Sequence, residues 1–166
     1  MDSGLRRNDG PSERDRMWSM TAEALYRDVV LDHYRHPRNR GTLARCTHAA
    51  DGVNPLCGDS LRIEVDCTDG RIARMGFSGE ACAITTATAS MLSELAVGRD
   101  ANEIAALNAP FDRLLAGEID IADSLGPLNA LAELRRHPSR RKCAELPWAT
   151  LRAALGGEAR TTTESP

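Results

Sequence analysis

Three cysteines and one aspartate stand where they could share a metal ion. Cys57 and Asp59 flank Gly58, and glycine permits the sharp turn that two ligands one residue apart require. Cys82 and Cys143 lie far away in the sequence but in similar settings. Three thiolates and one carboxylate suit tetrahedral Zn²⁺, and thiolates are also the usual ligands of iron–sulfur clusters. Because the chain has no Cys-x-x-Cys pair, the spacing alone leaves open whether the four residues share a metal.

Two of these cysteines are placed where a thiolate is favoured. Cys82 comes just before a predicted helix, whose N-terminal amides and dipole stabilise a negative charge. Cys143 follows the basic residues Arg140, Arg141 and Lys142. Their charges would also offset the formal charge of about −2 that three thiolates and a carboxylate leave on a zinc site. Both cysteines are therefore candidates for chemistry.

Other candidate ligands have simpler interpretations. Cys67 continues the inward face of a predicted strand, where a free cysteine packs as a small hydrophobic residue. Cys46 lies in a connector without patterned neighbours. His33 falls on an apolar helical face and is interpreted as structural, whereas His137 is interpreted as solvated. Asp59 itself could cap its own turn instead of binding a metal.

Length and composition limit the classes of function. The 166 residues suit one domain. The net charge of −3 and the aromatic content of 4% argue against a nucleic-acid-binding surface. No apolar run is long enough to span a membrane. Five cysteines without a signal peptide do not form a secreted disulfide framework, so we expect a cytoplasmic protein with reduced thiols.

The hydrophobic pattern predicts an α+β domain with a small antiparallel sheet of about three strands packed against several helices. Alternating residues over 61–67 and 72–77, joined by Asp69-Gly70, indicate a hairpin. The helical segments follow Thr21, Cys82, Asp100 and Pro127, and Pro138 ends the fourth. A separate last element carries Cys143, either in a loose first turn or before a regular helix that begins near Leu146. Asp100 with Glu103 resembles a capping box for a short helix through Leu107, and residues 110–121 are expected to be irregular or to contain one helical piece.

The domain is expected to occupy residues 21–155. Residues 1–20 mix acidic and basic side chains with little to bury, so we expect a disordered extension. Whether residues 1–19 are translated stays open, because Met17 and Met20 are alternative starts. Residues 156–166 are polar and are expected to form a disordered tail.

The cysteine motifs resemble those of one known family, the SufU branch of the IscU/NifU-like iron–sulfur cluster assembly family. The resemblance covers about Ala22 to Leu155. The matching segments are Asn54-Pro-Leu-Cys-Gly-Asp59, Gly79-Glu-Ala-Cys-Ala-Ile84 with Ala87-Thr-Ala-Ser-Met91, Arg140-Arg-Lys-Cys-Ala144 with Trp148, Leu25-Tyr-Arg-Asp-Val-Val-Leu-Asp-His-Tyr34, and Pro37-Arg-Asn39 with Gly41. Lys142 stands where IscU-type scaffolds carry a histidine, and the chain lacks their Leu-Pro-Pro-Val-Lys chaperone motif.

The resemblance implies an IscU/SufU-like fold and a Zn²⁺ ion held by Cys57, Asp59, Cys82 and Cys143. It further implies that Cys143 accepts persulfide sulfur from a SufS-type cysteine desulfurase. Arg140 matches the basic residue that the family places beside the metal, and Lys142 is expected to lie near Arg140, around the metal ligands. Downstream iron–sulfur scaffold or acceptor proteins would be the other partners. The chain would then act as a sulfurtransferase-type accessory protein.

Three functions remain to be separated. The first is zinc-dependent sulfur transfer, in which a thiolate attacks a persulfide sulfur. Lys142 favours this function over the second, a scaffold that binds iron or a transient [2Fe–2S] cluster. The third is a structural zinc domain for protein binding, whose loss of metal would unfold it.

Overall fold

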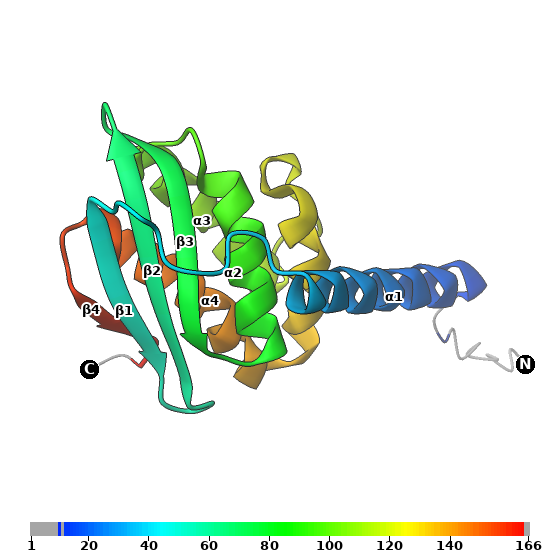
Figure 1. The fold of residues 1–166 in the computed structure, drawn as a ribbon. Coiled ribbons are helices and arrows are strands. Elements are labelled where there is room, and N and C mark those ends of the chain that lie inside the picture. The colour runs from blue at the N-terminus through cyan, green and yellow to red at the C-terminus, as the bar shows by residue number, and fades with distance from the viewer. Residues whose placement is uncertain (1–9, 11, 165–166) are drawn as a thin grey trace, which may run out of the picture.

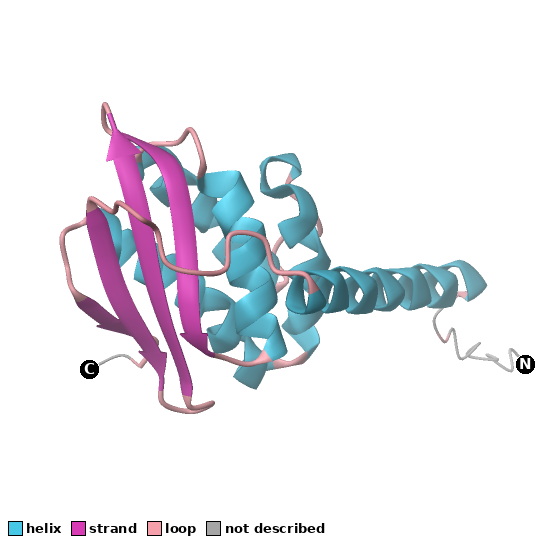
Figure 2. Cartoon of the chain, in the orientation of Figure 1, coloured by secondary structure: helices cyan, strands magenta, loops and turns pink. Residues whose placement is uncertain are grey.

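A four-stranded mixed sheet forms one layer of the molecule, and helices cover one of its faces (Figures 1 and 2). The computed structural model describes residue 10 and residues 12–164, with residues 14–20 described by their backbone alone. The strand order is β3-β2-β1-β4. The strands are β1 (His48–Asn54), β2 (Asp59–Thr68), β3 (Arg71–Glu80) and β4 (Arg160–Thr162). β2 pairs antiparallel with both β1 and β3, whereas β4 pairs parallel with β1.

The β2–β3 hairpin confirms the strongest strand prediction. Asp69 and Gly70 both have positive φ, 53° and 78°, as a two-residue hairpin turn of this twist requires. The register shifts between Asp66 and Cys67. This irregularity interrupts the alternation, so Cys67 is only partly buried at the edge of the core instead of lying fully within it.

The helices lie on one side of the sheet, where two of them contact the strands directly and the others pack on those two (Figure 1). Their bounds are α1 (Glu13–Arg35), α2 (Ala83–Ala96), α3 (Ala101–Ala116), the 3₁₀ segment η1 (Asp123–Arg136) and α4 (Pro138–Leu155). β1 lies so close to α4 that a Cβ atom on Gly52 would collide with Thr150 Oγ1. No helix among the described residues is long and apolar enough to cross a membrane.

The end of α1 is tied to α2 by a small polar network. His33 is buried, and its Nδ1 lies 2.8 Å from Ser90 Oγ. The backbone N–H of Arg38 donates to the same oxygen at 2.8 Å, and Asn39 Nδ2 donates to Ser93 Oγ at 3.0 Å. Burial lowers the pKa of His33. The structural interpretation of His33 is therefore confirmed.

Four boundaries differ from the sequence-based expectations. α1 already includes residues 13–20, within the expected extension, while residues 1–9 and 11 lie outside the described residues. β1 occupies much of the expected connector, and β4 lies in the expected tail. α3 runs through Pro110 to Ala116. It continues because Phe111, Leu114 and Leu115 are buried in the core, which outweighs the hydrogen bond that the proline removes.

Candidate metal centre

The candidate ligands come from three elements that meet at one end of the sheet. Cys57 lies on the β1–β2 turn, where the N–H groups of Cys57 and Gly58 donate to the Asn54 carbonyl at 3.2 and 2.9 Å. Gly58 has φ 71°, a conformation that costs glycine little. Cys82 is the N-cap residue of α2. Cys143 lies inside α4, so its backbone is regular helix and not the loose first turn that was considered.

The structure brings three candidate ligands together. The Sγ atoms of Cys57 and Cys143 are 3.2 Å apart. These two sulfurs and a carboxylate oxygen of Asp59 all lie within 4.8 Å of one another. Cys82 is not part of this tight group, and its Sγ lies 3.4 Å from Thr85 Oγ1. Cys143 is 2% exposed, whereas Cys57 is exposed at the surface.

Asp59 connects the turn to the start of α2. It is 4% exposed, and its Oδ1 accepts a hydrogen bond from the Cys82 N–H at 2.8 Å. The Thr85 hydroxyl lies 2.8 Å from its Oδ2. Asp59 thus hydrogen-bonds to the start of α2. Each carboxylate oxygen keeps a lone pair that a metal could use.

Thr85 is a site residue that sequence reasoning missed. Pro147 lies inside α4 and has no N–H, so the carbonyl of Cys143 lacks its helical donor. The Thr85 hydroxyl supplies one, with its Oγ1 3.0 Å from the Cys143 oxygen. Because this hydroxyl has a single proton, it serves one acceptor at a given moment: the Cys143 carbonyl, Asp59 or the Cys82 sulfur, which lies 3.4 Å away. The sequence signal was Pro147, four residues after Cys143, because it indicates that the Cys143 carbonyl needs a donor from elsewhere.

Replacing Thr85 with valine is expected to lower the free energy of unfolding by about 1–3 kcal/mol, because a buried carbonyl of Cys143 is left without a donor. Urea denaturation of the metal-free protein measures this loss. Thr88→Val is the matched control, since Thr88 is equally buried in α2 but donates to the Ile84 carbonyl within its own helix at 2.7 Å. Equal losses in the two variants would contradict the role of Thr85.

A second variant tests the link between Thr85 and Pro147. Pro147→Ala restores an N–H that can donate to the Cys143 carbonyl. In that background the loss caused by Thr85→Val is expected to shrink by about 1 kcal/mol, a coupling typical of residues that share a partner. Purely additive effects would show that the two residues do not act on the same carbonyl.

The thiols of Cys82 and Cys143 change each other's pKa in opposite directions. A hydrogen bond from Cys143, with help from Thr85, lowers the pKa of Cys82 to about 6. The same hydrogen bond, together with burial, raises the pKa of Cys143. Cys82, at the start of α2, is therefore the more acidic of the two thiols.

Asn54 is a second residue that the candidate ligand set did not include. It is fully buried, and its Nδ2 donates to Cys143 Sγ at 3.8 Å. Its Oδ1 has no hydrogen-bond partner among the described residues. Because the amide is neutral, its type alone gave no reason to assign it to the site. It can stabilise charge on the Cys143 sulfur.

The two basic candidates lie in different environments. Arg140 is exposed. Burial raises the pKa of Tyr26, the charge of Arg140 opposes this rise, and the nearby Cys82 and Cys143 add to it. Arg140 and the two cysteines thus all act on the Tyr26 hydroxyl. Lys142 instead donates to Glu164 Oε1 at 3.1 Å. Its charge is directed to the segment after β4.

Comparison with known proteins places this geometry in a family. The NifU-like N terminal domain model matches residues 25–162. The zinc-dependent sulfurtransferase SufU of Bacillus subtilis (strain 168) is 34% identical over 137 residues, which are 82% of this chain and 92% of that protein. The iron–sulfur cluster assembly scaffold protein IscU of Streptococcus pyogenes serotype M1 is 33% identical over 138 residues, covering 79% and 82% of the two chains.

Solved structures agree. A crystal structure of a candidate SUF-system scaffold protein for iron–sulfur cluster assembly from Fervidobacterium islandicum AW-1 superimposes with a TM-score of 0.74 at 25% identity, covering 80% of this chain and 98% of that one. The N-terminal part of a NifU-like protein from Brucella abortus has a TM-score of 0.74 at 19% identity, with 83% and 96% covered, and shares the fold. The α+β architecture predicted from the sequence is thus confirmed, and the chain belongs to the NifU-like N-terminal domain family.

Proposed function

We propose that this chain is a zinc-dependent sulfur-transfer protein of iron–sulfur cluster assembly, which takes persulfide sulfur from a SufS-type cysteine desulfurase. One observation carries the proposal: Cys57, Asp59 and Cys143 converge, with Cys82 beside them through the hydrogen bond from its N–H to Asp59. The similarity to a zinc-dependent sulfurtransferase supports it. Downstream scaffold or acceptor proteins would receive the sulfur.

The donor set fits zinc. Ligand atoms within 4.8 Å of one another can be held by one ion at about 2.0–2.3 Å from each. A rotation of the Cys82 side chain would add the fourth ligand, because the backbone of Cys82 is already hydrogen-bonded to Asp59. When bound, the zinc ion would keep the thiols deprotonated and protect them from oxidation.

Cys143 is the proposed acceptor. Its thiolate would attack the outer sulfur of the desulfurase persulfide, forming a new S–S bond while the old one breaks, and the desulfurase cysteine would leave as a thiolate. Because Cys143 is 2% exposed, the donor can reach it only after the turn that carries Cys57 moves aside. That turn is suited to moving, since Leu56 is 67% exposed and the space around Gly58 is open.

The basic residues near Cys143 suggest how the partner is oriented. Arg135 is paired with Asp120 at 2.8 Å and Arg136 with Glu133 at 3.5 Å. Arg140 is exposed, and no ion pair is found for it among the described residues. It is therefore the residue best placed to steer an acidic surface of the desulfurase toward the thiols.

A scaffold for a [2Fe–2S] cluster is the second candidate function. It would use the same four ligands, and the similarity to a scaffold protein of Streptococcus pyogenes favours it. The two functions differ in the metal that belongs to the site. A protein purified with one zinc ion per chain and without visible absorption supports sulfur transfer, whereas a transferable cluster formed only with the desulfurase supports the scaffold.

Cysteine desulfurase turnover, measured as alanine released from cysteine, is the decisive test. Adding the zinc-loaded chain is expected to raise the turnover severalfold, because it removes the persulfide that otherwise blocks the next cycle. Cys46→Ala is a suitable control, since Cys46 is exposed and outside the site. An unchanged rate would point to a structural zinc domain and contradict the proposal.

A further inference from the structure

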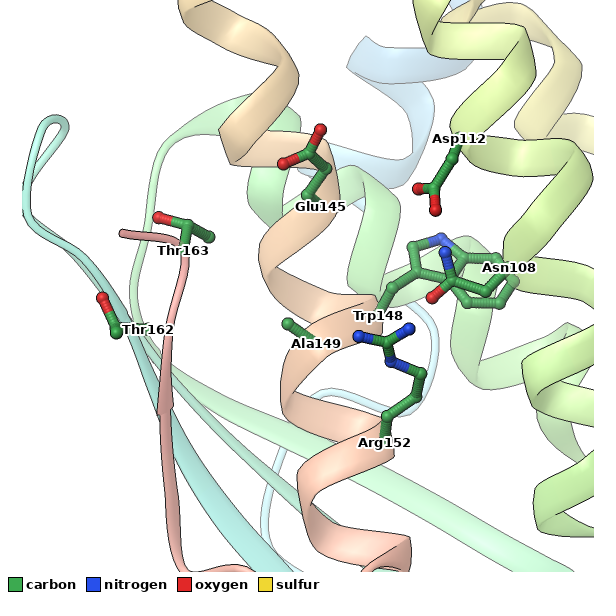
Figure 3. Close-up of a pocket in the computed structure, with 8 residues that line it drawn as sticks. All are labelled: Asn108, Asp112, Glu145, Trp148, Ala149, Arg152, Thr162 and Thr163. Carbon is green, nitrogen blue, oxygen red and sulfur yellow. The ribbon is translucent and has the colours of Figure 1, made fainter. Parts of the chain in front are cut away.

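A hollow of about 290 Å³ lies between α3, α4 and the end of β4, and it contains none of the four candidate ligands. Figure 3 shows its lining side chains. They are Asn108, Asp112, Glu145, Trp148, Ala149, Arg152, Thr162 and Thr163. Neither the metal centre nor sulfur transfer accounts for this group. Its volume is near the lower end of the roughly 300–1,000 Å³ typical of ligand pockets.

Two buried polar atoms in the lining have no partner. Trp148 is 1% exposed, yet its Nε1–H donates to no described residue, and Thr163 Oγ1 is likewise unpaired. Figure 3 shows the indole nitrogen turned toward Asp112. The ring is held by stacking on Phe111 at a centroid distance of 5.1 Å. Because buried donors are almost always paired, this N–H indicates an acceptor that the protein itself does not provide.

The same hollow carries charges of both signs. Asp112 comes from α3, and Glu145 and Arg152 come from α4 (Figure 3). Among the described residues no ion pair involves any of the three. Burial raises the pKa of Asp112, and Arg152 is close enough to oppose part of this rise. Charged groups that line a hollow without pairing are available to a ligand.

We infer that this hollow binds a small zwitterion of the α-amino acid class. The ammonium group lies against the carboxylates of Asp112 and Glu145. The carboxylate accepts from the Trp148 Nε1–H and from Arg152. A simple cation would leave the indole N–H unpaired, and a simple anion would face two carboxylates. A zwitterion is the small ligand that satisfies the donors and the acceptors together.

The inference is independent of zinc binding and sulfur transfer, and its test reads the hollow directly. The zinc-loaded, ¹⁵N-labelled full chain is titrated with L-alanine, and the indole N–H signal of Trp148 is followed by NMR. We expect a saturable downfield shift, because the ligand carboxylate becomes its hydrogen-bond acceptor. Trp148→Phe assigns the signal, and the indole of Trp18 serves as an internal reference. Ethylamine and propionate, which each carry one of the two charges, are expected to cause no saturable shift.

Variants of the charged groups complete the test. Arg152→Gln and Asp112→Asn are each expected to weaken L-alanine binding about ten-fold or more, as the loss of one charge-assisted hydrogen bond does. Arg152 is exposed, so its replacement does not endanger folding. Arg113→Gln is the matched control, because Arg113 lies on α3 outside the lining and pairs with Glu118. No saturable shift with L-alanine, or an equal response to ethylamine or propionate, overturns the inference.

Discussion

Cys143→Ser is expected to reduce sulfur acceptance from the desulfurase by about a hundred-fold or more, since a serine hydroxyl is not ionised at neutral pH and is a far weaker nucleophile than a thiolate. Mass spectrometry of the chain after a single desulfurase turnover measures the added sulfur. Zinc content is measured on the same samples. This separates loss of the acceptor from loss of the metal.

The choice between Cys143 and Cys57 is the sharpest part of this prediction. Cys57 is exposed and Cys143 is buried, so accessibility alone would favour Cys57. Cys57→Ser is expected to weaken the metal site yet leave a detectable persulfide on Cys143. Cys46→Ser should behave like the wild type. If Cys143→Ser accepted sulfur at the wild-type rate, the assignment of Cys143 as the acceptor would be wrong, and Cys57 would be the acceptor instead.

Asp59→Asn is expected to lower zinc affinity by about 10–100-fold or more, while changing the stability of the metal-free protein little. Asparagine keeps an oxygen that can accept from the Cys82 N–H, whose bond to Asp59 Oδ1 is 2.8 Å long. It removes the negative charge that a zinc ligand supplies. Competition with a chromophoric chelator measures the affinity, and urea denaturation measures the stability.

Two further variants separate the two roles of Asp59. Asp59→Ala also leaves the Cys82 N–H unpaired, which is expected to cost about 1–3 kcal/mol of metal-free stability. Asp66→Asn is the matched control, because Asp66 is also a buried carboxylate of β2 but pairs with Arg74. If Asp59→Asn bound zinc as tightly as the wild type, Asp59 would be a capping residue and not a ligand.

The sequence predicted the parts of the fold that depend on local signals. The Asp69-Gly70 hairpin, the helix after Cys82 and the Asp100–Glu103 capping box are all present. Each is encoded within a few neighbouring residues, by alternation, by helical periodicity or by a cap. Their positions could therefore be predicted without knowledge of the tertiary structure.

Elements that depend on distant partners were missed. β1 reads His-Ala-Ala-Asp-Gly-Val-Asn, which has neither clear alternation nor many β-branched residues, and β4 has only three residues. Both exist because each pairs with a neighbour, and β-propensity depends strongly on that context. Residues 13–20 were expected to be disordered from their mixed charges, but glutamate, arginine and methionine are good helix formers and continue α1.

The site residues divide in the same way, into those that could be predicted from the sequence and those that depend on distant partners. The thiols and Asp59 could be selected from the sequence, because ionisable side chains that bind metals are recognised by residue type. Thr85 and Asn54 are neutral and common, and their roles depend on which atoms the fold places beside them. Pro147 matters only because a hydroxyl from another helix reaches the carbonyl that it leaves unpaired. Such roles exist only in three dimensions.

The contact between Cys57 and Cys143 joins positions 86 residues apart. A metal held there would link two distant parts of the chain. Such an ion would bind well only when α4 is docked beside the β1–β2 turn, so metal binding would increase the folded population. In a cell short of zinc, more chains would have α4 undocked, and degradation by proteases would then set how long each copy of the protein survives.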